Sequence, residues 1–277
     1  MRVISAREIT DLVKDMCIEA NYYLPCDIEQ KIENAKMNEQ SEVGKDILDK
    51  LLQNAQIARD KKMAICQDTG MAVFFVEIGC DVHIDGNITD AINEGVRQGY
   101  AQGNLRKSIV SDPIERKNTN DNTPAVIHYD FVDGDKVSVT IAPKGFGSEN
   151  MSALKMFSPS DGIEAIKDFV VETVSKAGGN PCPPIVVGVG IGGNFESCAT
   201  LAKKALADAK KNENPFYESI ENELLERINK LGIGPQGFGG TQTALDVFIK
   251  TAPTHIAGLP AAVNISCHVT RHLTKVI

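Results

Sequence analysis

The sequence has few aromatic residues, no excess of positive charge and no long apolar run. Its 277 residues include 29 Lys and Arg against 37 Asp and Glu, which gives a formal net charge of −8, and 5 % are aromatic. An acidic chain without a basic, aromatic-rich patch is a poor match for a nucleic-acid surface. No stretch reaches the roughly 18 uncharged apolar residues of a membrane span. We therefore expect small molecules or other proteins as its partners.

The N-terminal segment lacks the pattern of a secretion signal. Its apolar residues recur at helical spacing with charged residues between them, which predicts an amphipathic helix. We expect a cytoplasmic protein, in which thiols stay reduced. The seven cysteines, an odd number, are then free thiols or ligands and not disulfide partners.

The remaining pattern mixes helices and strands, and it contains no internal repeat and no low-complexity tract. Helical spacing dominates the first 62 residues, and it predicts later helices over 89–102, 160–177, 196–211 and 217–230. Buried strands are predicted over 71–78, 185–189 and 245–250.

Two alternating runs, 125–131 and 136–141, flank Asp133-Gly134-Asp135. This arrangement predicts an antiparallel hairpin. We predict a mixed α/β (α+β) fold in which a helical region over 1–62 precedes a mixed α/β region with one βα unit over 63–277. The two regions are expected to form a single domain with room for two subdomains.

One glycine-rich segment resembles a nucleotide-binding motif. Gly188 to Gly193 fits G-x-G-x-x-G between a predicted strand and a predicted helix, and Asp208 follows at the distance of an acidic ribose ligand. However, Asp208 falls inside the following helix and not at the end of a second strand. An NAD-binding oxidoreductase would depend on this motif alone. A glycine turn before a helix could still bind an anion such as a carboxylate.

Three cysteines differ from the other four in their surroundings. Cys66 precedes Gln-Asp-Thr-Gly, Cys182 lies among prolines, and Cys267 follows a turn-rich segment, so we expect all three on irregular backbone. A helical cysteine such as Cys198 is more often a small buried hydrophobic residue. The three lie too far apart in the sequence to match the clustered ligands of zinc fingers or ferredoxins. Spacing alone therefore leaves a metal site undecided.

Five sequence blocks in the order of the chain narrow the choice. They are CQDTG (66–70), GNLRKS (103–108), APKGFGSEN (142–150), CPPIVVGVGIGG (182–193) and SCHVTR (266–271). Together they resemble the α subunit of two-subunit class I fumarate hydratases and L-tartrate dehydratases, which are iron–sulfur hydro-lyases. The family usually has Lys-Gly-Gly-Gly-Ser in the third block, so Phe146 and Glu149 are departures that bear on the substrate contacts.

The resemblance implies an oxygen-sensitive [4Fe–4S] cluster bound by Cys66, Cys182 and Cys267, with its fourth iron open to substrate. An iron with an open position can act as a Lewis acid. Cys198 is the one rival for the middle ligand, but Cys182 occupies the Cys-Pro-Pro block. A non-catalytic or redox-sensing iron–sulfur protein would use the same three cysteines without needing Arg106 or His255.

The resemblance also assigns roles to residues that, without it, would be interpreted as structural. Asp68, by itself a typical turn residue, and His255, by itself a typical structural histidine, would together move the proton of the water or hydroxyl group. His255 is expected to share a loop with Cys267. The residues expected to bind a small dicarboxylate substrate or neutralise its charge are Gln67, Arg106, Gly145, Gly147 and Arg271.

The expected reaction is the reversible hydration of fumarate to (S)-malate. Dehydration of L-tartrate to oxaloacetate is the alternative, because one extra substrate hydroxyl is a pocket detail that the blocks do not encode. Single-chain relatives continue into a second domain. We therefore expect a separate β subunit to supply the remaining catalytic residues, in an α₂β₂ assembly, and little activity from this chain alone.

Overall fold

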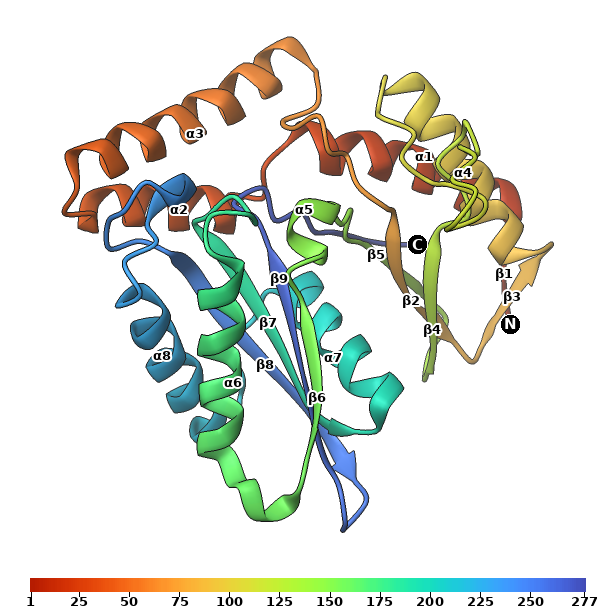
Figure 1. Ribbon diagram of the computed structural model, residues 1–277. Helices are drawn as coiled ribbons and strands as arrows, with labels where there is room; N and C mark the ends of the chain where they lie inside the picture. Colours follow the sequence, from red (N-terminus) through yellow and green to blue (C-terminus); the bar gives the residue numbers. More distant parts are fainter. The chain divides into compact units, whose positions relative to one another are not determined.

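The structure is a computed structural model that describes all 277 residues, and it divides into two compact units (Figure 1). Unit 1 comprises Met1–Pro25, Asn54–Gly145 and Arg271–Ile277, and unit 2 comprises Cys26–Gln53 and Phe146–Thr270. Each unit contains helices and a four-stranded sheet, which confirms the predicted mixed α/β class. The helical region over 1–62 contributes helices to both units.

Unit 1 is built on a sheet with the strand order β10-β5-β2-β4, beside a separate parallel pair, β1-β3. Helix α3 (Glu42–Lys61) begins in unit 2 and ends in unit 1. The other elements of unit 1 are β1 (Arg2–Ser5), α1 (Ala6–Tyr22), β2 (Val73–Gly79), β3 (Val82–Asp85), α4 (Ile88–Gln102), β4 (Val126–Val132), β5 (Val137–Ile141) and β10 (Leu273–Val276).

Helices α1 and α4 supply the apolar side chains that cover the sheet of unit 1. Ser5 and Glu8 form a capping box that starts α1, and Asn87 caps α4. The helices approach closely because Gly95 presents no side chain: a Cβ there would lie 2.7 Å from the Cβ of Val13. Their buried residues join those of β2 and β5 in one core, which positions the segments that enter and leave the sheet.

The predicted hairpin over 125–141 is wrong. Strands β4 and β5 run in opposite directions but do not pair, because β2 lies between them, parallel to β4 and antiparallel to β5. At the end of β2, Gly79 passes so close to the connecting turn that a Cβ there would lie 2.3 Å from Gly134 O. The connection between β4 and β5 therefore wraps around the end of β2.

Unit 2 is built on a sheet with the strand order β6-β9-β7-β8, covered by α6 and α8 on one face and by α7 on the other (Figure 1). Strand β8 is parallel to β7, and β9 is antiparallel to both β7 and β6. The elements of unit 2 are α2 (Cys26–Asn38), α5 (Phe146–Glu149), β6 (Ala153–Phe157), η1 (Pro159–Asp161), α6 (Gly162–Ala177), β7 (Ile185–Gly193), α7 (Phe195–Asp208), α8 (Pro215–Asn229), η2 (Pro235–Gly237), β8 (Ala244–Thr254) and β9 (Leu259–Ser266).

Two of the nucleotide-like glycines, Gly188 and Gly190, lie in the interior of β7, and the third, Gly193, ends that strand with a φ of +68°. A Cβ on Gly188 would lie 2.2 Å from Ala202 O, and one on Gly190 would lie 2.1 Å from Cys198 O, so α7 packs directly on the glycine backbone. Asn194 Oδ1 accepts from the N–H groups of Glu196 and Ser197 in the first turn of α7. Gly188 and Gly190 thus serve helix–strand packing, and Asn194 already accepts from two of the N–H groups that an anion at the helix start would use.

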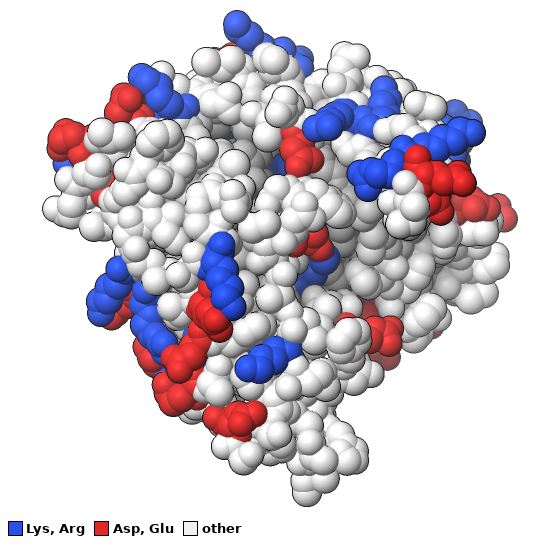
Figure 2. Space-filling view, in the orientation of Figure 1, with Lys and Arg blue, Asp and Glu red and all other residues white.

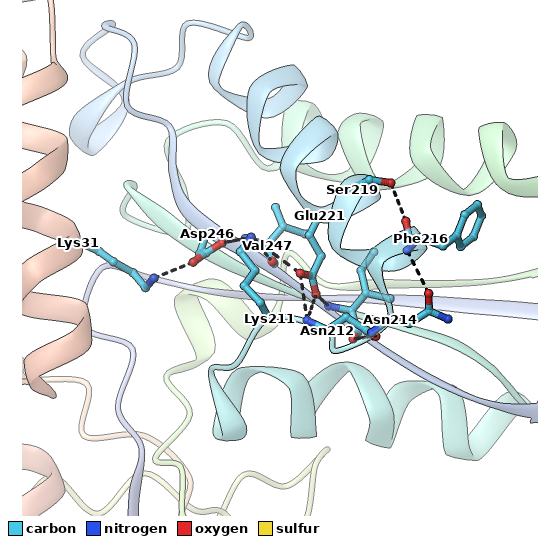
Figure 3. A network of polar contacts seen from close by, with 10 residues as sticks. Lys31, Lys211, Asn212, Asn214, Phe216, Ser219, Glu221, Asp246 and Val247 are labelled. Carbon is cyan, nitrogen blue, oxygen red and sulfur yellow. Dashed lines mark hydrogen bonds and ion pairs between the residues drawn. The ribbon is translucent and has the colours of Figure 1, made fainter.

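Several charged side chains of unit 2 form ion pairs. Lys167 bridges Glu164 and Glu223, so basic and acidic groups adjoin over α6 and α8 (Figure 2). At the edge strand β8, Asp246 accepts from Lys31 at 2.7 Å and from Lys211 at 2.6 Å (Figure 3).

Glu221 of α8 lies in the same network and is fully buried. It accepts from the Ile249 N–H at 2.7 Å, and burial raises the pKa of its carboxyl group. These contacts fix α8 and α2 to the edge of the sheet. No helix of the chain is both long and apolar enough to cross a membrane.

Candidate functional site

The CQDTG loop of unit 1, residues 66–70, connects α3 to β2. Cys66 is half-buried, and its Sγ accepts from the Asp68 N–H at 3.4 Å. Asp68 Oδ1 accepts from the Gly70 N–H at 3.1 Å. Gly70 has a φ of +74°, and a Cβ there would lie 2.6 Å from the Lys144 carbonyl carbon, so the turn requires glycine. The loop thus places a thiol and a carboxylate two residues apart on a tight turn.

Side chains from distant segments hold this loop. Tyr100 of α4 is fully buried and donates to Thr69 O at 2.9 Å and to Gly70 O at 3.1 Å. Burial raises the pKa of the Tyr100 hydroxyl group, which therefore remains a donor. Buried Asn122 also donates to Gly70 O, at 3.2 Å. The carbonyl oxygens of Thr69 and Gly70 therefore have hydrogen-bond partners within the protein.

Arg271 also belongs to the support of the loop. Its side chain is buried and donates from Nη1 to Asn21 Oδ1 at 2.7 Å and from Nη2 to Asp68 O at 3.0 Å. Nε is buried without a hydrogen-bond partner. Two of the three guanidinium nitrogens therefore donate to oxygens of the protein. In the structure, Arg271 positions the loop. The substrate contact expected of it stays a prediction.

Three other predicted site residues of unit 1 lie on the CQDTG loop or contact it. Gln67 is exposed on the loop, and Arg106 is exposed while its backbone N–H donates to Thr69 Oγ1 at 3.0 Å. A Cβ on Gly145 would lie 2.9 Å from Asp68 Oδ2, so that carboxylate packs against the bare backbone of residue 145. Unit 1 therefore brings together Cys66, Gln67, Asp68, Arg106 and Gly145.

In unit 2 the strands bring Cys182 and Cys267 to one end of the sheet. Cys182 precedes β7 and Cys267 follows β9, and the antiparallel register pairs Val186 with Ser266. Cys182 is exposed with a φ of +55°, and Cys267 is half-buried. Gly147 of α5 lies nearby, since a Cβ there would have Asn180 O as its nearest neighbour, at 3.9 Å.

His255 does not share a loop with Cys267. It lies in the exposed turn between β8 and β9, and its Nδ1 accepts from the Ala257 N–H at 3.2 Å. The intervening strand β9 has eight residues, which extend about 25 Å at the usual rise of a strand. The prediction of a shared loop is wrong because closeness in sequence becomes distance when the residues between are extended. The structure places His255 at the opposite end of the sheet from both cysteines.

Cys198, the rival ligand, is fully buried in α7. Its Sγ donates to Phe195 O at 3.6 Å, and burial raises the pKa of its thiol. A thiol in this setting resists deprotonation, whereas a metal ligand must be a thiolate. The geometry therefore favours Cys182 over Cys198.

The donor set fits an iron–sulfur cluster in chemistry and in backbone setting. Cys66, Cys182 and Cys267 all lie outside helices and strands and are exposed or half-buried. One is in unit 1 and two are in unit 2, and the structure contains no group of three or more His, Cys, Asp or Glu side chains that could hold a metal ion. Thiolates on irregular backbone are the usual ligands of such clusters.

Sequence reasoning missed the residues that hold the candidate site in place. Tyr100 fits the apolar face of α4, and Asn122 lies in an Asn-rich loop, so neither stands out by motif or spacing. Only the contact of each with the turn at Gly70 shows its role.

Comparison with known proteins identifies the family. The family model described as fumarate hydratase (Fumerase) matches residues 10–276. The chain belongs to this family. A Methanocaldococcus jannaschii protein provisionally named L(+)-tartrate dehydratase subunit alpha is 43 % identical over 97 % of each chain. The L(+)-tartrate dehydratase subunit alpha of Escherichia coli O157:H7 is 31 % identical over 99 % of this chain and 92 % of its own length.

Fumarate hydratases and tartrate dehydratases are both enzymes that add or remove water. The fumarase-family chain is therefore a hydro-lyase, as the five sequence blocks predict. The two relatives carry the name of a tartrate dehydratase subunit, whereas the family model is described as fumarate hydratase.

Proposed function

We propose that this chain is the α subunit of an iron–sulfur hydro-lyase that dehydrates L-tartrate or a closely similar dihydroxy diacid. The observation that carries the proposal is the match of 43 % identity over nearly the whole length to a protein named for that activity. Hydration of fumarate is the second candidate, supported by the description of the family. The relatives' names as α subunits support a β partner for this chain, which would supply the groups that it lacks.

Cys66, Cys182 and Cys267 would hold a [4Fe–4S] cluster. When bound, the cluster would supply a Lewis acid that weakens the bond between carbon and the departing hydroxyl group. Asp68 would give a proton to that hydroxyl, or take one from water in the reverse direction, because its carboxylate follows Cys66 by two residues on the same turn.

The carboxylates of the substrate would be bound from unit 1. Arg106 is exposed on backbone that is fastened to Thr69, so its planar guanidinium can approach a carboxylate with two parallel hydrogen bonds. Gln67 and the bare backbone at Gly145 adjoin Asp68 and would orient the remaining oxygens. Gly147, which lies close to Asn180 in unit 2, would also contribute to substrate binding.

His255 would take part only in the site of another polypeptide. About 25 Å of strand separates it from Cys267 in its own chain, and it stands in an exposed turn. An exposed turn can reach into a neighbouring chain without rearranging its own sheet. The assignment of His255 to proton transfer therefore requires an assembled enzyme.

Anaerobic reconstitution with iron and sulfide tests the cluster and the substrate separately. We expect about four irons per chain, lost in Cys66→Ala, Cys182→Ala and Cys267→Ala but retained in the matched control Cys198→Ala. After mixing with a β subunit, turnover of L-tartrate should exceed hydration of fumarate. No iron in the wild type would contradict the cluster, and faster turnover of fumarate would return the assignment to fumarate hydratase.

A further inference from the structure

A glycine-rich segment of unit 2, residues 232–243, contacts the Cys182 turn. It connects α8 to β8 and includes η2. Gln236 in η2 has a φ of +53°, and its backbone N–H donates to Pro183 O at 2.7 Å while its side-chain Nε2 donates to the same oxygen at 2.8 Å. One residue thus supplies two donors to the carbonyl directly after Cys182.

The polar groups of Cys182 itself are also satisfied. Its N–H donates to Gly179 O at 3.1 Å, and its carbonyl oxygen lies 2.9 Å from His268 Nδ1. A carbonyl can only accept, so Nδ1 of His268 carries the proton and donates. Gln236 Nε2, 3.2 Å from the same Nδ1, then makes a packing contact, and its hydrogen bond goes to Pro183.

These hydrogen bonds stabilise an unfavourable backbone conformation at Cys182. The φ of Cys182 lies in the left-handed region, which costs a non-glycine residue about 1 kcal/mol. No strand pairs with residues 181–184, since β7 begins at Ile185. The hydrogen bonds from Gln236 and His268 therefore take the place of a sheet ladder at this turn.

Glu39 fixes the segment that carries Gln236. Its buried carboxylate accepts from the N–H groups of Thr241 at 2.9 Å and of Gln242 at 2.9 Å. A Cβ on Gly240 would lie 2.8 Å from this carboxylate, so the chain wraps tightly around it. Burial by itself would raise the pKa of Glu39, but its backbone hydrogen bonds outweigh that effect and the pKa is lowered.

We propose that Gln236 is a positioning residue for Cys182, which holds the thiol of the exposed turn in place for the cluster. The inference rests on the proposed function for the identity of the bound group. The contacts themselves belong to the chain without a cluster. Gln236 approaches the turn through its side-chain amide and its backbone N–H, both of which donate to Pro183 O.

The test uses Gln236→Gly, because glycine tolerates a φ of +53° and the variant removes the side-chain amide without adding backbone strain. Phe238→Ala is the matched control, since that side chain is exposed in the same segment. Hydrogen exchange of a peptide spanning 178–186 is measured in the cluster-free chain. Iron per chain and the rate of cluster loss are measured after anaerobic reconstitution.

We expect exchange about fivefold faster in Gln236→Gly, as for the loss of one net hydrogen bond, together with faster loss of iron. Phe238→Ala should match the wild type in both measurements. Unchanged exchange, or faster exchange with the cluster retained as in the wild type, would overturn the proposal. If the wild type holds no iron, the proposed function fails, while the exchange measurement still decides whether Gln236 orders the turn.

Discussion

The two regions that carry the candidate cysteines are held in place by different means. In unit 1 the CQDTG loop is fastened by the buried side chains of Tyr100, Asn122 and Arg271, which come from distant parts of the sequence. In unit 2 the register of β7 and β9 brings Cys182 and Cys267 to one end of the sheet, and Gln236 and His268 complete the turn.

The difference indicates where each region is vulnerable. The loop in unit 1 is held by buried side chains, and each of their hydrogen bonds is lost on substitution. In unit 2, Gln236 also donates to Pro183 O through its backbone N–H, and that hydrogen bond survives a change of side chain. Substitutions that loosen the loop of unit 1 should therefore have larger local effects than comparable substitutions near the cysteine turn of unit 2.

The largest effect is expected from Arg271→Ala. It removes two hydrogen bonds from a buried charged group, so the free energy of unfolding should fall by about 3 kcal/mol. Hydrogen exchange should rise in a peptide spanning 64–70 and stay unchanged over 178–186. Arg271→Lys, which keeps the charge and loses the planar fork, should recover part of the stability. An equal rise in hydrogen exchange over both peptides would contradict the conclusion that the two regions are held by different means.

A smaller effect on the same loop is expected from Tyr100→Phe. The ring stays in the core while the donor to Thr69 O and Gly70 O is lost, which should cost about 1.5 kcal/mol in a urea titration. Tyr22→Phe is the control, since that hydroxyl donates to Gly103 O outside the loop. Unchanged hydrogen exchange over 64–70 in Tyr100→Phe would contradict the conclusion that buried side chains hold the loop.

The third effect concerns unit 2 and depends on pH. Because the folded pKa of Glu39 is lowered from 4.5, its carboxylate stabilises the fold fully above about pH 4.5, and this contribution is lost as the pH falls through the lower folded value. Glu39→Gln should therefore reduce the free energy of unfolding by about 1 kcal/mol at pH 7, with a difference from the wild type that shrinks in acid. A difference independent of pH between 7 and 3 would assign the loss to packing instead.

The smallest effect is expected from His255→Ala. The side chain is exposed in the β8–β9 turn, so the free energy of unfolding should change by less than about 0.5 kcal/mol. The iron content of the reconstituted chain should be unchanged. Turnover by the assembled enzyme should fall, because His255 is proposed to act in another polypeptide. Iron loss in this variant would place the histidine near its own cysteines, against the strand geometry.

The sequence predicted most elements because their patterns are local. Helix α1 has an amphipathic face and a capping box, and α4 ends at Gly103 as its sequence indicates. The pairing of β4 and β5 could not be predicted in this way, since alternation reports which face of a strand is buried and not which strand lies beside it. The insertion of β2 between them depends on contacts between distant segments.

The candidate site shows the same division. Cys66, Asp68 and Arg106 were found because motifs mark them, and the structure joins them through the backbone of one loop. The sequence does not fix the distance between His255 and Cys267, because the residues between them can form a loop or an extended strand, and β9 is a strand. Tyr100, Asn122 and Gln236 carry no motif, since their roles exist only through contacts made after folding.

The pairing of β10 with β5 has a consequence for the order of folding. Thr274 of β10 contacts Thr140 of β5 across 134 intervening steps of the chain, and all of the second segment of unit 2 is synthesised between them. The whole of that segment is synthesised before Arg271 and β10 can join unit 1. The loop that carries Cys66 is therefore the first candidate ligand region to be translated, yet its support Arg271 is translated after all three candidate cysteines.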